Sequence, residues 1–288
     1  MIREVAIMSA LTLFLLVIGY VVGVFLGIDP TFTTLFALII AVTMNFATYF
    51  FSDKIVLRMS HARLVSEQEE PRLHRIVAMM AIKAGIPKPK VAVVPTDVPN
   101  AFATGRNPQN AVVAATTGLL RILDENEIEG VLAHEVSHVM HRDTLISAMA
   151  ATIAGAIGYV AWFGQMSVFY GGGRRDSRQG GNSILALLAF LFVPIASMFL
   201  QLAISRSREY KADEAGAKIS MQPLSLASAL SKIENYVQHR PLQGVSPSTS
   251  ALWVVNPFRG QGLTELFSTH PATSKRIRRL QQIAQSGP

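Results

Sequence analysis

The sequence contains no cysteine and has few charged residues. Because none of the 288 residues is cysteine, disulfides and thiolate metal sites are excluded. Any metal site must therefore use histidine and carboxylate ligands. Only 16% of the residues are charged, whereas 50% are hydrophobic, and the hydrophobic residues are gathered into blocks. This composition is typical of a membrane protein and argues against an ordinary soluble enzyme.

Four apolar blocks carry most of this hydrophobicity. Residues 5–27 and 31–51 contain no charge, and each meets the roughly 20-residue length that crosses a bilayer core. Because the link at 28–30 is short, they are predicted to form a transmembrane hairpin, and the immediate second span argues against a cleavable signal peptide. Residues 145–170 and 183–204 predict a second hairpin. The third block is rich in Ala and Gly, so a buried core helix is the alternative for it.

The distribution of positive charge predicts the orientation of these blocks. Residues 52–144 contain eleven Lys and Arg, whereas the link at 28–30 contains none. Since positively charged loops stay inside, we expect residues 52–144 and both termini in the cytoplasm. The loop between the third and fourth blocks carries Arg174, Arg175 and Arg178, which opposes a full crossing. The second hairpin is therefore an exception to the charge rule, or it dips into the membrane without crossing.

The net charge of +7 fits the same cytoplasmic bias beside anionic lipid. No nucleic-acid-binding motif and no interleaving of aromatic with basic residues accompanies it, so no nucleic-acid partner is expected. The lipid bilayer is the expected partner, and the sequence leaves the oligomeric state open.

The sequence thus predicts a mainly α-helical integral membrane protein with a small α/β domain. An N-terminal transmembrane hairpin covers residues 1–51, and the second hydrophobic hairpin covers 145–204. The α/β domain is split between them, with its first part at 52–144 and its C-terminal part at 205–288. The second hairpin is thereby an insertion into that domain.

Residues 52–144 show the pattern of a compact α/β unit. A helix is predicted over 70–84, with apolar residues on one face and Gly85 as its stop. Short strands are predicted at 91–94 and 111–115. Between the strands lies PNAFATGRNPQN, in which residues 100–102 could form an exposed strand edge that pairs with an extended peptide. An ordinary hairpin loop explains the same residues equally well.

The C-terminal part is predicted to be helical on either side of a long loop. SRSREYKADEAGA predicts one helix, and a second is expected over 224–238. A segment rich in Pro, Gly and Ser follows at 241–262, which predicts a loop. The chain closes with STHPATSKRIRRLQQIA, a predicted turn and basic helix.

The motif HEVSH lies in a predicted helix that Asp124 caps, with Glu127 in the capping-box position. Positions i and i+4 of a helix face the same way, so His134 and His138 can present two imidazoles to one ion. Glu135 is turned by about 100° and can reach a water on that ion. With 7 His and 12 Glu in the chain, chance gives this motif about 0.007 times. A metal site, with zinc as the ion, is therefore the better explanation.

A catalytic zinc usually has three protein ligands and a water, so a third ligand is needed. In SRSREYKADEAG, Glu209 and Asp213 share one helix face, where one could bind metal and the other could support a ligand histidine. A solvated charged face explains the same spacing equally well. His141 is expected to be a solvated or capping residue. Other histidines stay open as the third ligand: His61, His74, His239 and His270.

The order of these motifs resembles the HtpX-type membrane zinc metalloproteases, which are gluzincins related to the CAAX prenyl endopeptidases. The resemblance rests on PNAFATG, HEVSH, SRSREYKAD and THPATSKRI, with one apolar hairpin at the N-terminus and another inside the domain. It covers nearly the whole chain. It implies that the α/β domain is a zincin-like catalytic domain, which would be a metalloprotease unit facing the cytoplasm.

The resemblance also implies a role for several residues. His134 and His138 match the histidine ligands of one Zn²⁺ per chain, Glu209 matches the third ligand, and Glu135 matches the general base. Asp213 matches the aspartate that supports a ligand histidine.

Three further residues fall in family motifs near the active site. Asn100 is expected to bind substrate, and Arg206 is expected to support the site from outside the ligand group. For His270 two expectations stay open: it stabilises the oxyanion, or it packs beside Pro271 in a turn.

The expected activity is hydrolysis of peptide bonds in misfolded or damaged membrane proteins, as part of membrane-protein quality control and a stress response. The expected location is the bacterial cytoplasmic (inner) membrane, crossed several times. A prenyl-protein endopeptidase and a catalytically silent zinc-containing scaffold are alternatives. Four blocks are few for the first, and Glu135 has no purpose in the second. A transporter is disfavoured because the ionisable residues lie outside the apolar blocks.

Overall fold

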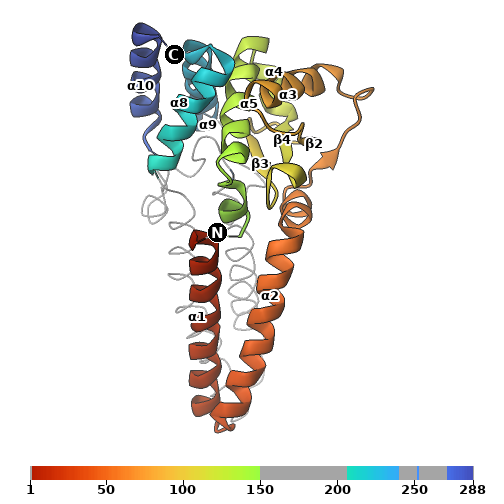
Figure 1. Cartoon of the computed structure of the whole chain (residues 1–288), viewed down its shortest axis with the longest axis vertical. Helices are drawn as coiled ribbons and strands as arrows, with labels where there is room; N and C mark the ends of the chain where they lie inside the picture. Colours follow the sequence, from red (N-terminus) through yellow and green to blue (C-terminus); the bar gives the residue numbers. More distant parts are fainter. Residues whose placement is uncertain (1, 150–205, 240–251, 253–270, 288) are drawn as a thin grey trace.

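Two long antiparallel helices project from one end of the molecule (Figure 1). The computed structural model describes residues 2–149, 206–239, 252 and 271–287. The paired helices are α1 (Ile2–Leu26) and α2 (Pro30–Met59), which pack against each other where the N-terminal transmembrane hairpin was predicted. The second apolar hairpin from residue 150 onwards, most of the loop at 241–262 and His270 lie outside the described residues.

The tight turn of the hairpin follows from its sequence. The side chain of Asp29 accepts a hydrogen bond from the backbone N–H of Thr31 (2.8 Å), and Pro30 occupies the first turn of α2. Gly19 and Gly23 allow close packing, since a Cβ on Gly23 would lie 2.3 Å from the Thr33 hydroxyl. Within the described residues, α2 is the one helix long and apolar enough to cross a membrane, and α1 contributes a shorter apolar stretch at 8–24.

Helix α2 continues past residue 51, where the sequence places the end of the span. Phe51 departs from helical geometry (φ −122°, ψ 15°), so the helix kinks there and runs on to Met59. Beyond the kink, Val56 and Leu57 are buried in a cluster with Phe102 of the sheet. This packing joins the hairpin to the rest of the protein.

Within the part of the chain that the structure describes, the sheet has four strands in the order β1-β2-β4-β3. Central strands β2 and β4 run parallel to each other and consist mainly of buried Val and Ala, as strands covered on both faces do. The outer pairs, β1 with β2 and β3 with β4, are antiparallel. The bounds are β1 (Arg63–Leu64), β2 (Lys90–Val94), β3 (Ala101–Thr104) and β4 (Val112–Thr116).

Residues 100–102, for which a strand edge or a hairpin loop was expected, lead into a strand whose side chains are buried. Residues 101 and 102 begin β3, which is an edge strand of the sheet. Their side chains are buried, however, as is that of Asn100. These side chains are buried in part because α2 and α5 both contact β3.

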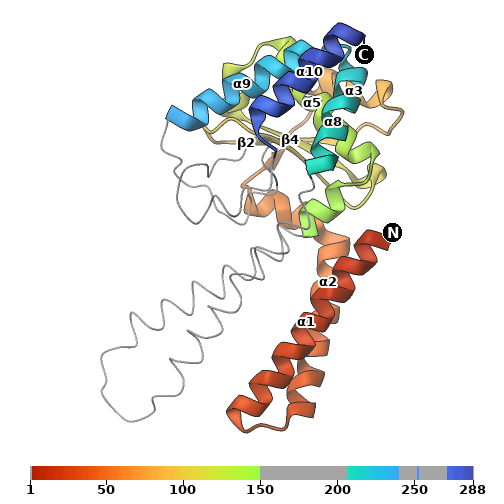
Figure 2. The same ribbon diagram turned by 90° about the vertical axis from the view of Figure 1, so that its left-hand side faces the viewer.

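Helices cover the sheet, and α5 (Glu125–Met140) lies at their centre. It contacts the sheet and α3 and also packs against α8 and α9, an arrangement that can be followed in Figure 2. The predicted capping box at Asp124 and Glu127 is present at its start. The other elements are α3 (Pro71–Lys83), the 3₁₀ turn η1 (Pro108–Asn110), α4 (Thr117–Ile122), α8 (Arg206–Ser220), α9 (Pro223–His239) and α10 (Thr273–Ser286).

Candidate metal centre

Two helices that are far apart in the sequence bring three metal-binding side chains together. His134 and His138 lie on α5, and Glu209 lies in the first turn of α8. Nε2 of His134 is 3.7 Å from Oε2 of Glu209, and Nε2 of His138 is 3.5 Å from Oε1 of Glu209. One ligand atom from each residue lies within 4.8 Å of the others.

The close approach of α5 and α8 depends on a glycine. A Cβ on Gly216 would lie 2.9 Å from the backbone N and Cα of His134. Gly216 therefore lets α8 lie directly on the turn of α5 that carries the first histidine. The Ser137 hydroxyl also lies within hydrogen-bond distance of the Ala212 carbonyl (3.3 Å), which links the two helices one turn further along.

The donor set fits a zinc ion. Zinc binds His nitrogen and carboxylate oxygen at about 2.0–2.2 Å, so adjacent donors of a tetrahedral site are separated by about 3.3–3.5 Å. The two histidine–carboxylate distances, 3.5 and 3.7 Å, are close to that spacing before any adjustment. Two imidazoles and one carboxylate also leave a fourth position open, as in catalytic zinc sites.

Glu135 lies beside this group and is buried. Burial raises the pKa of the Glu135 carboxyl, and Glu209 adds to the rise. The two histidines and a hydrogen bond from the backbone N–H of Ala103 oppose it. The Glu135 carboxylate therefore lies close to the backbone of β3.

The first histidine is supported by a buried ion pair. Nδ1 of His134 is 3.0 Å from Oδ1 of Asp213 on α8. Arg276 on α10 donates to both carboxylate oxygens of Asp213, at 2.6 and 2.8 Å. Burial alone would raise the pKa of the Asp213 carboxyl, but the Arg276 charge and the hydrogen bonds outweigh it and hold that pKa below its usual value.

Arg276 also faces the metal-binding group itself. Its Nη1 is 3.6 Å from Oε2 of Glu209, and its Nη2 is 3.5 Å from Nε2 of His134. The side chain is almost fully buried, with 2% of its surface exposed. Sequence reasoning missed this residue, although Thr273, Arg276 and Leu280 recur at helical spacing on the buried face of α10. The sequence signal that could have found Arg276 was a single charged side chain on this otherwise uncharged face.

The remaining described histidines do not join the ligand group. His141 is the C-cap of α5, with its Nδ1 2.8 Å from the Ser137 carbonyl oxygen, as expected of a capping residue. His74 lies 2.9 Å from the Val65 carbonyl, and His61 is an exposed residue with φ 52°.

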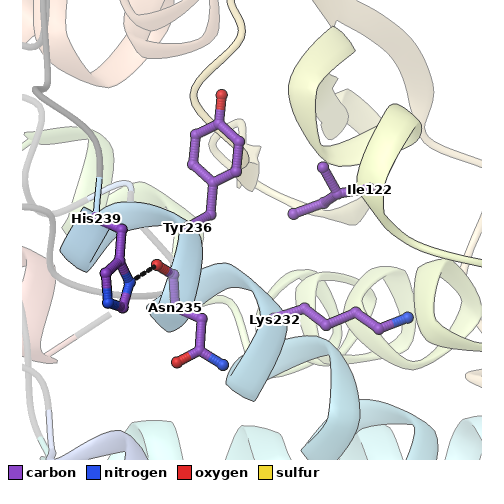
Figure 3. A pocket seen from close by; sticks show the side chains of 5 residues that line it. All are labelled: Ile122, Lys232, Asn235, Tyr236 and His239. Carbon is purple, nitrogen blue, oxygen red and sulfur yellow. Dashed lines mark hydrogen bonds between the residues drawn. The ribbon is translucent and has the colours of Figure 1, made fainter.

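His239 lines a separate groove of about 420 Å³ between α4 and α9. Figure 3 shows its ring turned toward its own helix, where Nδ1 lies 2.8 Å from the Asn235 carbonyl oxygen. Of the candidates for a third ligand that the structure describes, Glu209 is thus the one beside the HEVSH histidines.

Two other predicted site residues, Asn100 and Arg206, lie outside the metal-binding group. Asn100 is buried at the start of β3, and its side-chain amide donates to the Leu252 carbonyl (3.0 Å). Arg206 is the first residue of α8 and is exposed. Its neighbour Arg208 is buried instead and points toward Asp143, with Nε 3.9 Å from Oδ1.

Comparison with known proteins identifies the family. The family model described as "Peptidase family M48" matches residues 67–284, which include every described residue of the metal-binding group. The chain belongs to peptidase family M48. This M48 peptidase is 55% identical to "Protease HtpX homolog" of Pyrococcus furiosus over 98% of the chain and 96% of that relative. The equally named protein of Aquifex aeolicus is 51% identical over 94% of the chain and 88% of that relative.

Solved structures are also similar to this M48 peptidase. One of them is the crystal structure of S. mikatae Ste24p, with a TM-score of 0.49 and 18% sequence identity. The match covers 97% of this chain and 65% of the other, so this M48 peptidase spans just under two thirds of that protein's length. The family and the protease relatives confirm the HtpX-type resemblance and make the chain a metalloprotease, a hydrolase.

Proposed function

We propose that this protein is a membrane-bound zinc endopeptidase that cleaves misfolded or damaged membrane proteins at the cytoplasmic face. The observation that carries the proposal is the group formed by His134, His138 and Glu209, with the buried Glu135 beside it. A zinc-dependent peptide hydrolase needs a metal site with an open position and a nearby base, and these four residues supply both.

We infer that His134, His138 and Glu209 hold the zinc ion. When bound, zinc would polarise the scissile carbonyl and lower the pKa of a water toward about 7. Glu135 would accept the proton of the attacking water and pass it to the leaving amine. Asp213 would fix the orientation of the His134 ring through Nδ1, which leaves Nε2 as the metal-binding atom.

The edge strand β3 offers the substrate a place beside the base. Its Ala103 N–H hydrogen-bonds the Glu135 carboxylate, so a peptide lying along this edge would pass near the metal-binding group. Asn100 at the start of the strand is proposed to contact the substrate. The roles of Arg206 in supporting the site and of His270 in stabilising the oxyanion remain proposals drawn from the family motifs.

Membrane-protein substrates are favoured by the position of the hairpin. The end of α2 packs against β3 through Val56, Leu57 and Phe102, so the predicted span adjoins the strand that would hold the peptide. Exposed apolar side chains along α1 and α2, such as Leu13, Phe36 and Ile39, suit contact with lipid. A multi-pass location in the cytoplasmic membrane, with the catalytic part inside, completes the proposal.

The test is zinc-dependent cleavage of an unfolded membrane protein in detergent by the parent chain and by Glu135→Gln. We expect the variant to keep its zinc and to lose turnover by about 10²-fold or more, because its ligands survive while the base is lost. Equal cleavage by both proteins would refute the assigned mechanism. Zinc without cleavage in the parent would indicate the silent scaffold instead.

A further inference from the structure

At the C-terminus of helix α5 the backbone turns back toward His138, the second histidine of HEVSH. Arg142 has φ 59°, and its backbone N–H donates to the Val139 carbonyl (3.1 Å). The next N–H, that of Asp143, donates to the carbonyl of His138 (2.9 Å). These two bonds form a Schellman motif, which commonly has glycine where Arg142 stands. The motif holds the backbone of Asp143 beside the turn that carries His138.

The carboxylate of Asp143 lies between His138 and an arginine of the second half of the chain. Its Oδ2 is 3.5 Å from Nδ1 of His138, and its Oδ1 is 3.9 Å from Nε of Arg208. All three side chains are 15% exposed or less. Since Nε2 of His138 faces Glu209, the carboxylate is on the opposite side of the ring from the metal-binding atom.

The second histidine, His138, has the same kind of partners as the first, His134. His134 has Asp213 at Nδ1, with Arg276 behind the carboxylate. His138 has Asp143 at Nδ1, with Arg208 behind it, at longer distances. In both cases a carboxylate can fix the ring orientation, and a buried arginine lies behind that carboxylate.

We propose that Asp143, held by Arg208, is a positioning residue for His138. The proposal rests on the proposed function, because it takes His138 as a zinc ligand. We call the pair the Asp143–Arg208 clasp. Asp143 precedes and Arg208 follows the segment with the second predicted apolar hairpin, so the clasp joins both sides of that insertion at the metal centre.

Zinc affinity of the full chain in detergent, measured by competition with a chelator, tests the clasp. We expect Asp143→Ala to weaken zinc binding about 10–100-fold, as loss of a partner behind a metal-binding histidine does. Asp143→Asn should lie between this variant and the parent, and Arg208→Gln should cause a smaller loss that Arg208→Lys partly restores. The absorption spectrum of the Co²⁺-loaded Asp143→Ala protein should also shift, because the geometry around His138 changes.

The double variant separates positioning from general destabilisation. Because Arg208 acts through Asp143, Asp143→Ala with Arg208→Gln should bind zinc no more weakly than Asp143→Ala alone. The control is Lys211→Gln, which removes the same charge from an exposed position of α8 and should leave zinc affinity unchanged.

Parent-like zinc affinity in Asp143→Ala would overturn the proposal, and so would losses that add in the double variant. The proposed function fails separately: it is wrong if the parent binds no zinc, or if His138→Ala binds zinc as tightly as the parent. A parent that binds zinc through His138 while Asp143→Ala is unaffected refutes the clasp alone.

Discussion

Arg276 is the residue through which the closing helix reaches the metal centre. It forms a bidentate ion pair with Asp213, and both side chains are 2% exposed. Removing one partner of such a pair leaves an uncompensated charge in the interior, which costs more than the pair contributes. Arg276→Met, which keeps an unbranched apolar side chain but removes the charge, should therefore lower the free energy of unfolding by about 3–5 kcal/mol in a urea titration.

The matched control lies on the same helix. Arg278→Met removes an exposed arginine of α10 and should change the free energy of unfolding by less than about 0.5 kcal/mol. If both variants unfolded at the same urea concentration, the Arg276–Asp213 pair would not stabilise the fold as described.

At the residue scale, spacing alone predicted half of the metal centre. His134, Glu135 and His138 follow from the four-residue repeat of a helix face, which is a local property. Glu209 could not be chosen over a solvated charged face by spacing, because its neighbours are also charged; the resemblance selected it. The role of Asp143 could not be predicted, since Arg142 gives no sequence signal for a Schellman motif.

At the element scale, the packing of α8 on α5 predicts that Gly216→Ala destabilises the protein. Helix propensity alone predicts the opposite. Replacing a helical glycine by alanine normally stabilises a helix by about 1 kcal/mol. At Gly216, however, the added methyl would lie 2.9 Å from the backbone of His134, where backbone cannot give way cheaply. Gly216→Ala should therefore destabilise the protein by about 1–3 kcal/mol and weaken zinc binding.

The two measurements for this variant are the urea midpoint and the zinc dissociation constant. A higher midpoint with unchanged zinc affinity would show that propensity outweighs the contact, and the close packing of α5 and α8 would then be wrong. Glu214→Ala on the exposed side of α8 should change neither quantity.

Elements with a clear apolar pattern were predictable from the sequence, and the two-residue strand β1 was not. The predicted helix at 70–84 and strands at 91–94 and 111–115 match α3, β2 and β4 to within one residue. Strand β1, with two residues, has no periodicity to read, and its place at the sheet edge depends on pairing with β2. The burial of β3 could not be predicted because α2 and α5 cover it from distant parts of the sequence.

At the scale of the whole molecule, the chain combines a helical hairpin, predicted to lie in the membrane, with an α/β unit that is split in the sequence. The apolar blocks predicted the hairpin, but the continuation of α2 beyond residue 51 into the sheet cluster could not be read from hydropathy. The metal centre likewise depends on chain topology, because its histidines and its glutamate lie on either side of residues 145–204. The metal centre is thus assembled from two halves of the chain.

The assembly of the metal centre from two halves of the chain is tested by zinc content after a chelator challenge. The full chain and Glu209→Ala are compared under the same challenge, with Glu135→Gln as control. We expect the parent and Glu135→Gln to retain about one zinc per chain, as a site with three protein ligands does. Glu209→Ala should lose its zinc, because only the two histidines of α5 remain. Retention of zinc by Glu209→Ala at the level of the parent would contradict the assembly of the site from the two halves of the chain.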